Sequence, residues 1–452
     1  MSRDWNWATV DEIKAQNAHA ISMGPFGSDI KTDNFIAKGI PVIRGVNLSK
    51  RRFYEEGFVY ISEEKANELK SANAYPGDII FTHRGTLGQV SIIPRDSKYK
   101  RYVISQSQMK LTCDSTKADP LFIFYYFRSP VGQRELLKHT STTGVPALSH
   151  PLTSLKSIRV PLPSIVEQCA IANVLDCLDA KIELNSKINA TLEAFAEAIF
   201  KRWFVDFEFP DEFGKPYKSN GGELVSSEAG EIPKSWRLST LSEVLEIHDS
   251  KRIPLSSRER AKMRGPYRYY GATSVIDYVD NYLFDGTYVL LGEDGSVIKE
   301  DGTPVVQYVW GKFWVNNHAH VLTAGGGLST EQLFLLLKQV NISPYVSGAV
   351  QLKLNQNNLK AIPFVLPPHN VCVTFKEAID SLFQMYRANV EQSGVLNHLR
   401  DTLLPRLISG KISTRNKKRC DDGAEEIKRK PQVQTQSTLG DRPEDMKRLS
   451  IN

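Results

Sequence analysis

The sequence predicts an α+β protein with a pseudo-two-fold internal repeat, in which two β-rich globular domains are separated by two long helices that form an antiparallel coiled coil. Three observations predict this fold class. The phrase LKSIRVPLP at residues 155–163 returns as LKAIPFVLP at residues 359–367, 204 positions later. After each copy, apolar residues recur in alternating steps of three and four, the spacing of a coiled coil. Before each copy lie short β-branched runs punctuated by glycine and proline.

The length and composition favour a multidomain globular protein. A chain of 452 residues is too long for one typical core. Its net charge of +6 permits an anionic partner without requiring one. The five cysteines are scattered and form no CxxC pair, which argues against a zinc site and favours a reducing, cytoplasmic location. No stretch approaches the roughly 18 apolar residues of a membrane span, so none is expected.

The first globular region opens with WNWATVDEI at residues 5–13, which resembles WRLSTLSEV at residues 236–244 in the second half. Within the two regions, runs such as GIPVIRGVNL, GDIIFTHRG and GTYVLLGEDG predict short strands. The apolar segments PLFIFYYFRSP and TEQLFLLLKQV predict short buried helices or strands. The two halves therefore share a layout, although their globular regions have diverged.

The helices follow the repeated phrase. The match at an offset of 204 continues without a gap over roughly sixty residues. Each predicted helix has about 40 residues and a length of roughly 60 Å. Asn185 pairs with Asn389 and Arg202 with Arg406, each pair at one heptad position inside the predicted seam. Polar residues there either fix the register of the two helices or are hydrated positions on a solvated surface.

These elements define the predicted domain organisation. A stretch rich in glycine, serine and proline joins the halves as a linker, and the charged end of the chain is expected to be disordered. The boundaries are a first globular domain at 1–150, a spacer strand and long helix at 151–209, the linker at 210–232, a second globular domain at 233–353, a second spacer strand and long helix at 354–411, and the tail at 412–452.

The sequence carries no catalytic signature. It has no GxxxxGK[ST] phosphate loop, no Asn-Pro-Pro-aromatic stretch of the sort that amino-methyltransferases use, and no HExxH. His318 and His320 lack a third metal ligand at convincing spacing, so we interpret them as residues at a strand end or facing a polyanion. Glu293 and Asp294 are predicted to cap a turn. Catalytic residues and a metal site are therefore not expected, and a binding protein is favoured.

Basic residues cluster in both globular regions, and the second cluster is interleaved with tyrosines. Lysine and arginine neutralise phosphates, and arginine also reads guanine edges; a solvated surface is the alternative interpretation. Two such domains at opposite ends of paired helices would read two half-sites separated by about one DNA turn, roughly 34–36 Å. The DNA-binding candidates are Arg44, Asn47, Lys50, Arg51, Arg52, His83, Arg84, Gln106, Thr143 and Gly144 in the first region, and Arg264, Arg268, Tyr269, Tyr270, Asn317, His318, Gln351 and Lys353 in the second.

The order of motifs resembles the specificity subunit of type I restriction–modification enzymes. The resemblance covers residues 1 to about 411. It rests on GPFGSDI and GIPVIRGVNL, on the P-x-x-x-EQ-x-x-I helix start that contains Glu167 and Gln168, on the WF-x-x-F element at residues 203–207, and on the duplicated layout. The second helix start, LPPHNVCVTF, lacks the Glu-Gln pair. That pair either caps the first helix or contacts a partner.

The resemblance implies a function without catalysis in this chain. The globular regions would be target-recognition domains that each read half of a bipartite sequence in double-stranded DNA. The helices would bind two methyltransferase subunits, which carry S-adenosylmethionine, and a translocating restriction subunit that uses ATP and Mg would complete the complex. Two alternatives remain: a self-contained restriction–modification enzyme, which the missing methyltransferase motifs disfavour, and a coiled-coil scaffold that binds no DNA.

Overall fold

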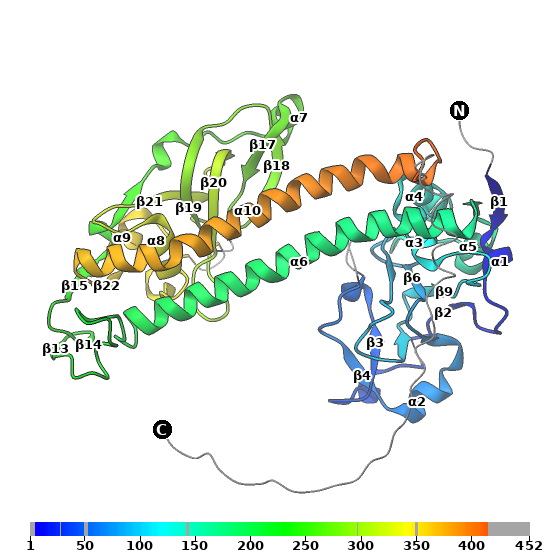
Figure 1. Ribbon diagram of the computed structural model, residues 1–452, viewed down its shortest axis with the longest axis horizontal. Coiled ribbons are helices and arrows are strands. Elements are labelled where there is room, and N and C mark those ends of the chain that lie inside the picture. The colour runs from blue at the N-terminus through cyan, green and yellow to red at the C-terminus, as the bar shows by residue number, and fades with distance from the viewer. Residues whose placement is uncertain are drawn as a thin grey trace, which may run out of the picture. The chain divides into compact units, whose positions relative to one another are not determined.

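The computed structural model describes residues 5–27, 29–48, 53–141, 144–295, 297–348 and 351–414. The chain divides into two compact units: one runs to Asp179 and resumes at His398, and the other spans Ala180–Asn397. Each unit contains one β-rich region and parts of two 40-residue helices, α6 (Ile165–Phe204) and α10 (His369–Ile408). The combination of mixed sheets, a repeat and two long helices confirms the predicted fold class (Figure 1).

Two four-stranded sheets form the globular part of the first unit. All four residues of β6 are buried because the strand lies between two cores: Ile79 and Phe81 face the cluster that contains α3, whereas Ile80 faces the cluster under the other sheet. The sheet orders are β2 (Ile21–Met23), β9 (Gln108–Leu111), β6 (Ile79–Thr82), β7 (Val90–Ile92), and β4 (Val59–Ile61), β3 (Ile40–Ile43), β8 (Tyr102–Ile104), β5 (Asn73–Ala74).

The apolar segment PLFIFYYFRSP folds as helix α3 (Pro120–Arg128). Asp119 caps it by accepting a hydrogen bond from the Phe122 amide, and Pro120 takes the first helical position, where no amide donor is needed. Six of its nine residues are buried, which explains why helical periodicity is hard to see in the sequence. The other helices of this region are α1 (Val10–Ile13), α2 (Glu63–Glu68), α4 (Pro130–Leu137) and α5 (Pro151–Ser157).

The second unit has a single six-stranded sheet in place of the two smaller ones. TEQLFLLLKQV forms helix α8 (Thr330–Leu337), which begins with a capping box between Ser329 and Gln332. The short helices α7 (Ser257–Lys262) and α9 (Gln356–Lys360) complete the unit. The sheet order is β16 (Leu245–Ile247), β21 (Ala319–Ala324), β19 (Phe284–Gly292), β20 (Val306–Val315), β17 (Arg264–Tyr270), β18 (Val275–Val279).

The repeated phrase forms the same structure in both units. It begins in the last turn of α5 or α9, where Leu155 and Leu359 are buried, and continues into a strand. In the first unit β12 (Arg159–Leu162) pairs antiparallel with β1 (Asn6–Thr9). In the second, β22 (Pro363–Leu366) pairs antiparallel with β15 (Arg237–Thr240) in the same register. The resemblance of residues 5–13 to 236–244 and that of residues 155–163 to 359–367 thus come from the two strands of one repeated pair.

The segment predicted as a linker has regular structure that the sequence did not predict. Strands β13 (Leu224–Ser227) and β14 (Gly230–Pro233) form a hairpin within it. The aromatic rings at the end of α6 fold onto Trp236: Phe204, Phe207 and Phe209 lie with ring centroids 5.7, 5.4 and 5.1 Å from it. The WF-x-x-F element therefore fastens the end of the first long helix to the start of the second globular region.

The long helices run antiparallel within each unit. In the second unit, Phe200 near the end of α6 packs against Phe375 near the start of α10, with ring centroids 5.7 Å apart. In the first unit, Ile171 near the start of α6 shares a core with Leu407 near the end of α10. No helix among the described residues is long and apolar enough to cross a membrane. The predicted charged tail lies outside the described residues from position 415 onward.

Candidate nucleic-acid interface

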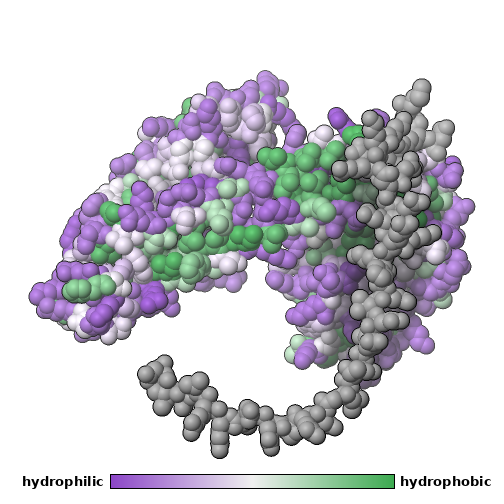
Figure 2. Space-filling view, viewed as in Figure 1, coloured by the Kyte–Doolittle hydropathy of each residue, from purple (hydrophilic) through white to green (hydrophobic). Residues whose placement is uncertain are grey.

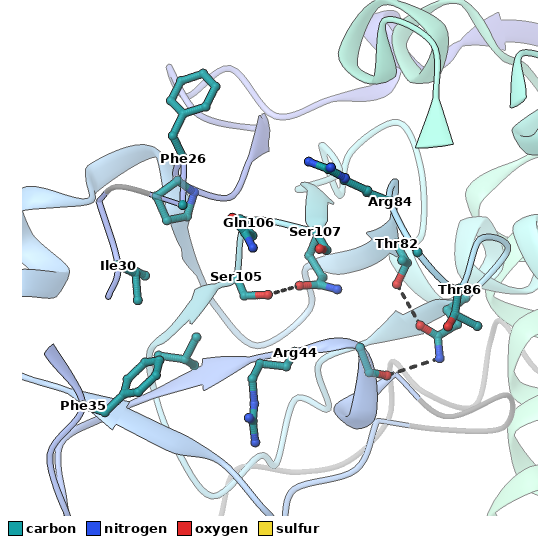
Figure 3. Close-up of a pocket in the computed structure, with 17 residues that line it drawn as sticks. Phe26, Ile30, Phe35, Arg44, Thr82, Arg84, Thr86, Ser105, Gln106 and Ser107 are labelled. Atoms are coloured by element: carbon teal, nitrogen blue, oxygen red, sulfur yellow. Dashed lines mark hydrogen bonds between the residues drawn. The ribbon is translucent and has the colours of Figure 1, made fainter. Parts of the chain in front are cut away.

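A pocket in the first unit brings together aromatic, amide and guanidinium groups (Figure 3). Its volume is about 420 Å³, and it lies where the ends of β3, β6 and β8 meet the loop that follows β2. Residues Phe26, Ile30 and Phe35 form its apolar side. Arg44 and Gln106 approach from other sides, so the pocket is amphipathic in the way small-molecule sites usually are.

The lip of the pocket is a tight turn that presents Phe26. The Asp29 carboxylate accepts a hydrogen bond of 3.2 Å from the Phe26 amide, and the Asp29 amide donates to the Phe26 carbonyl at 2.9 Å. A Cβ atom at Gly24 would lie 1.9 Å from the Ser105 carbonyl oxygen, so only glycine allows the loop to approach so closely. These contacts hold Phe26 and Asp29 together, while the Phe26 ring stays 78% exposed.

Arg44 follows β3 and is positioned by the 3-10 turn at Gly45–Asn47. The Asn47 side chain is buried, where its oxygen accepts from the Arg44 amide at 2.9 Å and its nitrogen donates to the carbonyls of Tyr54 and Glu56. One end of the Arg44 guanidinium donates to the Gly57 carbonyl at 2.8 Å. Its buried Nε has no hydrogen-bond partner among the described residues. Asn47 is therefore a buried brace for Arg44, which corrects its prediction as a DNA contact.

The floor of the pocket is a polar network. Thr82 donates to the Gln89 side-chain oxygen at 2.9 Å, and the Gln89 nitrogen donates to the Gly45 carbonyl at 3.2 Å. Ser105 donates to the side-chain oxygen of Gln108. Gln108 is fully buried, and its Nε2 has no hydrogen-bond partner among the described residues. Gln108 is not among the predicted DNA contacts, because nothing in SQSQMK distinguishes the two glutamines.

The electrostatics of the pocket favour an anionic or acceptor-rich ligand. None of the described residues that line it is an aspartate or a glutamate, whereas Arg44 and Arg84 are both cationic. His83 lies just below the rim, and its Nε2 is 3.0 Å from the Gln106 carbonyl oxygen. Burial lowers the pKa of His83 below its ordinary value, so the ring is neutral at pH 7. His83 therefore supports the Gln106 loop, and its burial corrects its prediction as a DNA contact.

Apart from the buried Asn47 and His83, the predicted candidates of the first region fall into three groups. Arg44, Arg84 and Gln106 line the pocket, although the Arg44 guanidinium is bound to the Gly57 carbonyl. Gly144 is exposed and has a left-handed backbone with φ of 79°, in the loop whose Pro146 carbonyl accepts from the Gly85 amide. Four predicted contacts lie outside the described residues: Lys50, Arg51, Arg52 and Thr143.

In the second unit, a buried ionic network lies where β16, β19 and β21 end or begin. His320 Nδ1 lies 2.6 Å from an Asp249 carboxylate oxygen, and His320 Nε2 lies 2.7 Å from the Leu354 carbonyl oxygen. Arg252 donates to Glu293 at 2.7 Å. Burial raises the pKa of Asp249, but the hydrogen bond and charge of His320 outweigh it and hold that pKa below its ordinary value.

This network resembles a cation site only in composition. Ligand atoms of Asp249, Glu293 and His320 lie within 4.8 Å of one another. However, both ring nitrogens of His320 face hydrogen-bond acceptors, so neither lone pair points toward a metal. The Arg252 guanidinium and the Gln356 amide already contact the carboxylates. The cluster therefore holds loops together, and Glu293 belongs to it rather than only capping a turn as predicted.

The polar rim above this network contains several predicted DNA contacts. Asn317 and His318 are exposed, and His318 Nδ1 lies 2.6 Å from the Asp294 carboxylate. Gln351 and Lys353 are also exposed, and the Lys353 Nζ lies 3.7 Å from Glu293. These side chains come from separate loops that the buried network fixes, so they share one rim.

The remaining candidates lie on strand β17, which exposes some of their side chains and buries others. Arg264 is exposed, and the Arg268 guanidinium stacks over the Trp310 ring at 5.9 Å. Tyr269 and Tyr270 are buried: the Leu255 amide donates to the Tyr269 hydroxyl, and Tyr270 packs in the core of the sheet. Their prediction as DNA contacts is corrected, because a run of aromatic and basic residues does not reveal which side chains the sheet buries.

The type I restriction modification DNA specificity domain family matches the chain twice, at residues 27–194 and 233–391, which together exceed half of its length. The chain belongs to this family. Among curated relatives, the MjaIX specificity subunit of Methanocaldococcus jannaschii is 25% identical over 383 residues, 78% of this chain and 84% of the relative. The HindI specificity subunit of Haemophilus influenzae is 23% identical over 403 residues, 74% of this chain and 86% of the relative.

A solved structure shares the fold of this specificity-subunit family member. The S subunit of the type I restriction–modification system from M. genitalium aligns with a TM-score of 0.55 and 17% identity, covering 90% of this chain and 97% of that chain. Family membership supports DNA sequence recognition without catalysis, with DNA and the other subunits of a restriction–modification complex as partners.

The predicted asparagine pair of the specificity subunit does lie between the long helices. Asn185 Nδ2 donates to the Asn389 carbonyl at 3.3 Å and to the Gln392 side-chain oxygen at 2.9 Å. Asn389 Nδ2 donates to the Asn189 oxygen at 2.9 Å, and Asn189 donates to the Tyr386 carbonyl. Shifting one helix by a turn would break this whole set, so these hydrogen bonds favour the observed register of the helix pair.

Arg202 and Arg406 do not lie in the seam, which corrects the sequence prediction. Both side chains are exposed. Near Arg202, α6 is about to end, and the carbonyl of Arg202 accepts the Glu208 amide in the turn that follows. Near the end of α10, Leu404 and Leu407 occupy the buried positions instead. The heptad phase inferred from apolar residues thus does not extend to the helix ends.

Gln168 is an internal brace at the start of α6 and is fully buried within the first unit. Its oxygen accepts from the Asp119 amide at 2.9 Å, and its nitrogen donates to the Pro163 carbonyl at 2.9 Å. Glu167 is also buried. Gln168 therefore supports the helix start from inside the unit, and Glu167 shares its burial. In the second unit, Cys372 occupies the position of Gln168, and its carbonyl accepts from Gln332 at 3.0 Å.

Proposed function

We propose that this chain recognises a bipartite DNA target, with one half-site read by each globular domain. The observation that supports it most strongly is a strand pair that both units share. The pairs β1–β12 and β15–β22 have the same register, although the sheets that lie between these strands in sequence differ in number and order. Two copies of one strand pair and helix, each with a different sheet, suit a protein that must read two different DNA sequences at a fixed separation.

The proposed contacts divide into base readers and phosphate anchors. Gln106 at the first-domain pocket has the donor and acceptor groups that read purine edges, and Arg84 at its rim is a candidate phosphate anchor. In the second domain, Asn317 and His318 on the rim and the exposed Arg264 of β17 are the corresponding candidates. The four candidates outside the described residues remain proposed DNA contacts.

We further propose that the long helices dock two methyltransferase subunits and, through them, the restriction subunits. Val166 and Leu184 lie 18 residues apart on α6, about five helical turns, and so share one face with Phe195 and Cys177. All four are exposed, away from the face that packs against α10. Figure 2 shows a band of apolar side chains over α6. An apolar stripe of this kind is typical of a protein–protein interface.

The chemistry would reside in those partners. In this proposal S-adenosylmethionine binds the methyltransferase subunits, and ATP and Mg bind the restriction subunits. This chain would set which DNA sequence reaches them.

The test of DNA recognition is a methylome comparison of cells that express the methyltransferase with and without this chain. We expect a bipartite methylated motif only when the chain is present, and Arg84→Gln should weaken methylation of that motif. Arg95→Gln, an exposed arginine of the same unit that does not line the pocket, is the matched control. Absence of a bipartite motif would refute the proposal and favour a scaffold that binds no DNA.

The docking proposal is tested by co-purification of tagged full-length chain with the methyltransferase. Phe195→Lys places a charge in the apolar stripe, and we expect binding to weaken by at least tenfold, about 1.4 kcal/mol. Ala194→Lys adds the same charge at an exposed neighbour about 100° around the helix and should change little. Equal loss of binding in both variants would refute the assignment of the stripe.

A further inference from the structure

We propose that the first domain holds one base of its half-site outside the DNA stack, in the pocket bounded by Phe26, Arg44 and Gln108. The inference rests on the proposed DNA recognition and adds a binding mode to it. A base within a stacked duplex offers only its groove edges, whereas an unstacked base offers two ring faces and its whole polar edge. The pocket has surfaces that complement both.

The shape of the pocket suits a flat aromatic ring. Its volume of about 420 Å³ falls within the range of roughly 300–1,000 Å³ of small-molecule sites. Phe26, Ile30 and Phe35 lie along one side, and Gln106 lies on another, while the Arg44 guanidinium points away toward the Gly57 carbonyl (Figure 3). A side chain set of this kind stacks on a base face and leaves the polar edge of the base toward hydrogen-bonding groups.

The polar side of the pocket holds a donor that lacks a partner within the protein. Gln108 is fully buried and lines the pocket, and Ser105 fixes its amide by donating to its oxygen. Its Nε2 then has no acceptor among the described residues. Buried amide donors are nearly always paired in folded proteins. A small rotation of the amide toward the pocket would let a carbonyl or ring nitrogen on the edge of a base supply the acceptor.

Phe26 has the position of a wedge that stabilises the gap left in the DNA. Its backbone is held by the reciprocal hydrogen bonds with Asp29 and by the close approach of Gly24 to Ser105. The ring nevertheless is 78% exposed at the mouth of the pocket. Exposed apolar side chains on a rigid turn are used by DNA-bending proteins to enter an opened base step. The same turn thus joins the wedge to the pocket that receives the base.

Charge favours DNA over other aromatic ligands. The pocket contains Arg44, and Arg84 stands at its rim, while no described lining residue carries a carboxylate. Arg84 is therefore available to the phosphate that flanks an unstacked nucleotide. The rim of the second domain is different, because Glu293 and Asp294 lie among its candidate contacts.

The test uses the full chain in complex with its methyltransferase and a duplex that carries the bipartite motif found by methylome sequencing. A panel of duplexes places 2-aminopurine at each position of the first half-site in turn, excluding the adenine that becomes methylated, because methyltransferases extrude their target base. We expect one position to gain fluorescence several-fold on binding, as unstacked 2-aminopurine does. Phe26→Ala should remove that gain and weaken binding by about 5- to 150-fold, the range for lost base–aromatic stacking.

Phe213→Ala is the matched control, because Phe213 is similarly exposed but lies in the second unit. Gln108→Met keeps the volume of the side chain and removes the donor, and it should also abolish the gain. If the complex binds its duplex tightly and no position brightens, the pocket proposal is overturned while DNA recognition stands. A gain that persists in both Phe26→Ala and Gln108→Met also overturns it. Failure of the wild-type complex to bind any duplex would instead overturn the proposed function.

Discussion

A buried carboxylate in the first unit connects three helices, and its removal gives a quantitative test of the packing. Asp179 on α6 lies 2.6 Å from Arg400 of α10 and 3.2 Å from Arg128 of α3. The Tyr125 hydroxyl donates to it at 3.0 Å. The side chains of both arginines are largely buried, and burial lowers the pKa of Arg128 while Asp179 counteracts this. We choose Asp179→Asn because it removes the charge with almost no change in shape.

The expected loss is large because the mutation removes the charge of the buried carboxylate that contacts both arginine side chains. Breaking a buried ion pair by removing one partner costs about 3–5 kcal/mol. At about 1.4 kcal/mol per tenfold change, this corresponds to an opening equilibrium that rises by roughly 140- to 4,000-fold. Asp401→Asn is the matched control. It removes the other carboxylate bound to Arg400, but Asp401 is 65% exposed, and exposed pairs contribute only about 0–1 kcal/mol.

Hydrogen exchange is the suitable assay, because a chain of two units is not expected to unfold in one step. Peptides from the start of α6 and the end of α10 should exchange faster in Asp179→Asn. Peptides from β19 and β20 in the second unit serve as an internal control and should not change. An acceleration of less than tenfold in the first unit, or an equal effect of Asp401→Asn, would refute the view that this carboxylate locks the three helices together.

Three further predictions concern the brace, the seam and the buried histidine. Gln168→Ala should destabilise the first unit by about 1–3 kcal/mol, because it leaves the Asp119 amide and the Pro163 carbonyl without their buried partner. The hydrogen-exchange protection of α3 measures this loss, and unchanged protection would contradict the prediction. Replacing both Asn185 and Asn389 by leucine should raise the melting temperature while relaxing the helix register, seen as new crosslinks between cysteines introduced one turn out of register; a lower melting temperature would contradict it. Burial lowers the pKa of His83 in the folded state. Below about pH 6.5, the ordinary pKa of histidine, the unfolded chain therefore binds more protons than the folded chain, and stability should fall as the pH drops. His83→Gln should flatten this part of the pH profile, and an identical profile in both proteins would rule out the assignment.

The repeat and the long helices could be predicted because their signals are local. Heptad spacing and the exit phrase are periodic patterns that any stretch of chain displays by itself. Asn185 and Asn389 were placed in the seam correctly, because both lie mid-helix where the pattern is strongest. Arg202 and Arg406 were placed wrongly, because the helix ends are packed by neighbouring loops and cores rather than by the facing helix.

The candidate site was predicted in part for a related reason. Arg44, Arg84 and Gln106 lie at strand ends marked by glycine or serine, and strand ends meet at the edges of sheets. Phe26 and Gln108 join them only because β2 and β9 are neighbours, a pairing between residues about ninety positions apart. Tyr269 and Tyr270 show the converse error, since burial on both faces of a sheet cannot be seen in the sequence of one strand.

By itself the sequence determined that the chain contains a globular domain, a strand and a long helix twice over, because such a duplication is visible as residues that repeat in the same order. Only the tertiary structure decided that the two offsets of that duplication form one strand pair, that Gln168 faces inward, and that an unpartnered amide and an exposed phenylalanine share one pocket. Those facts depend on contacts between distant segments, and such contacts arise when the sheets pack and the buried polar groups find partners.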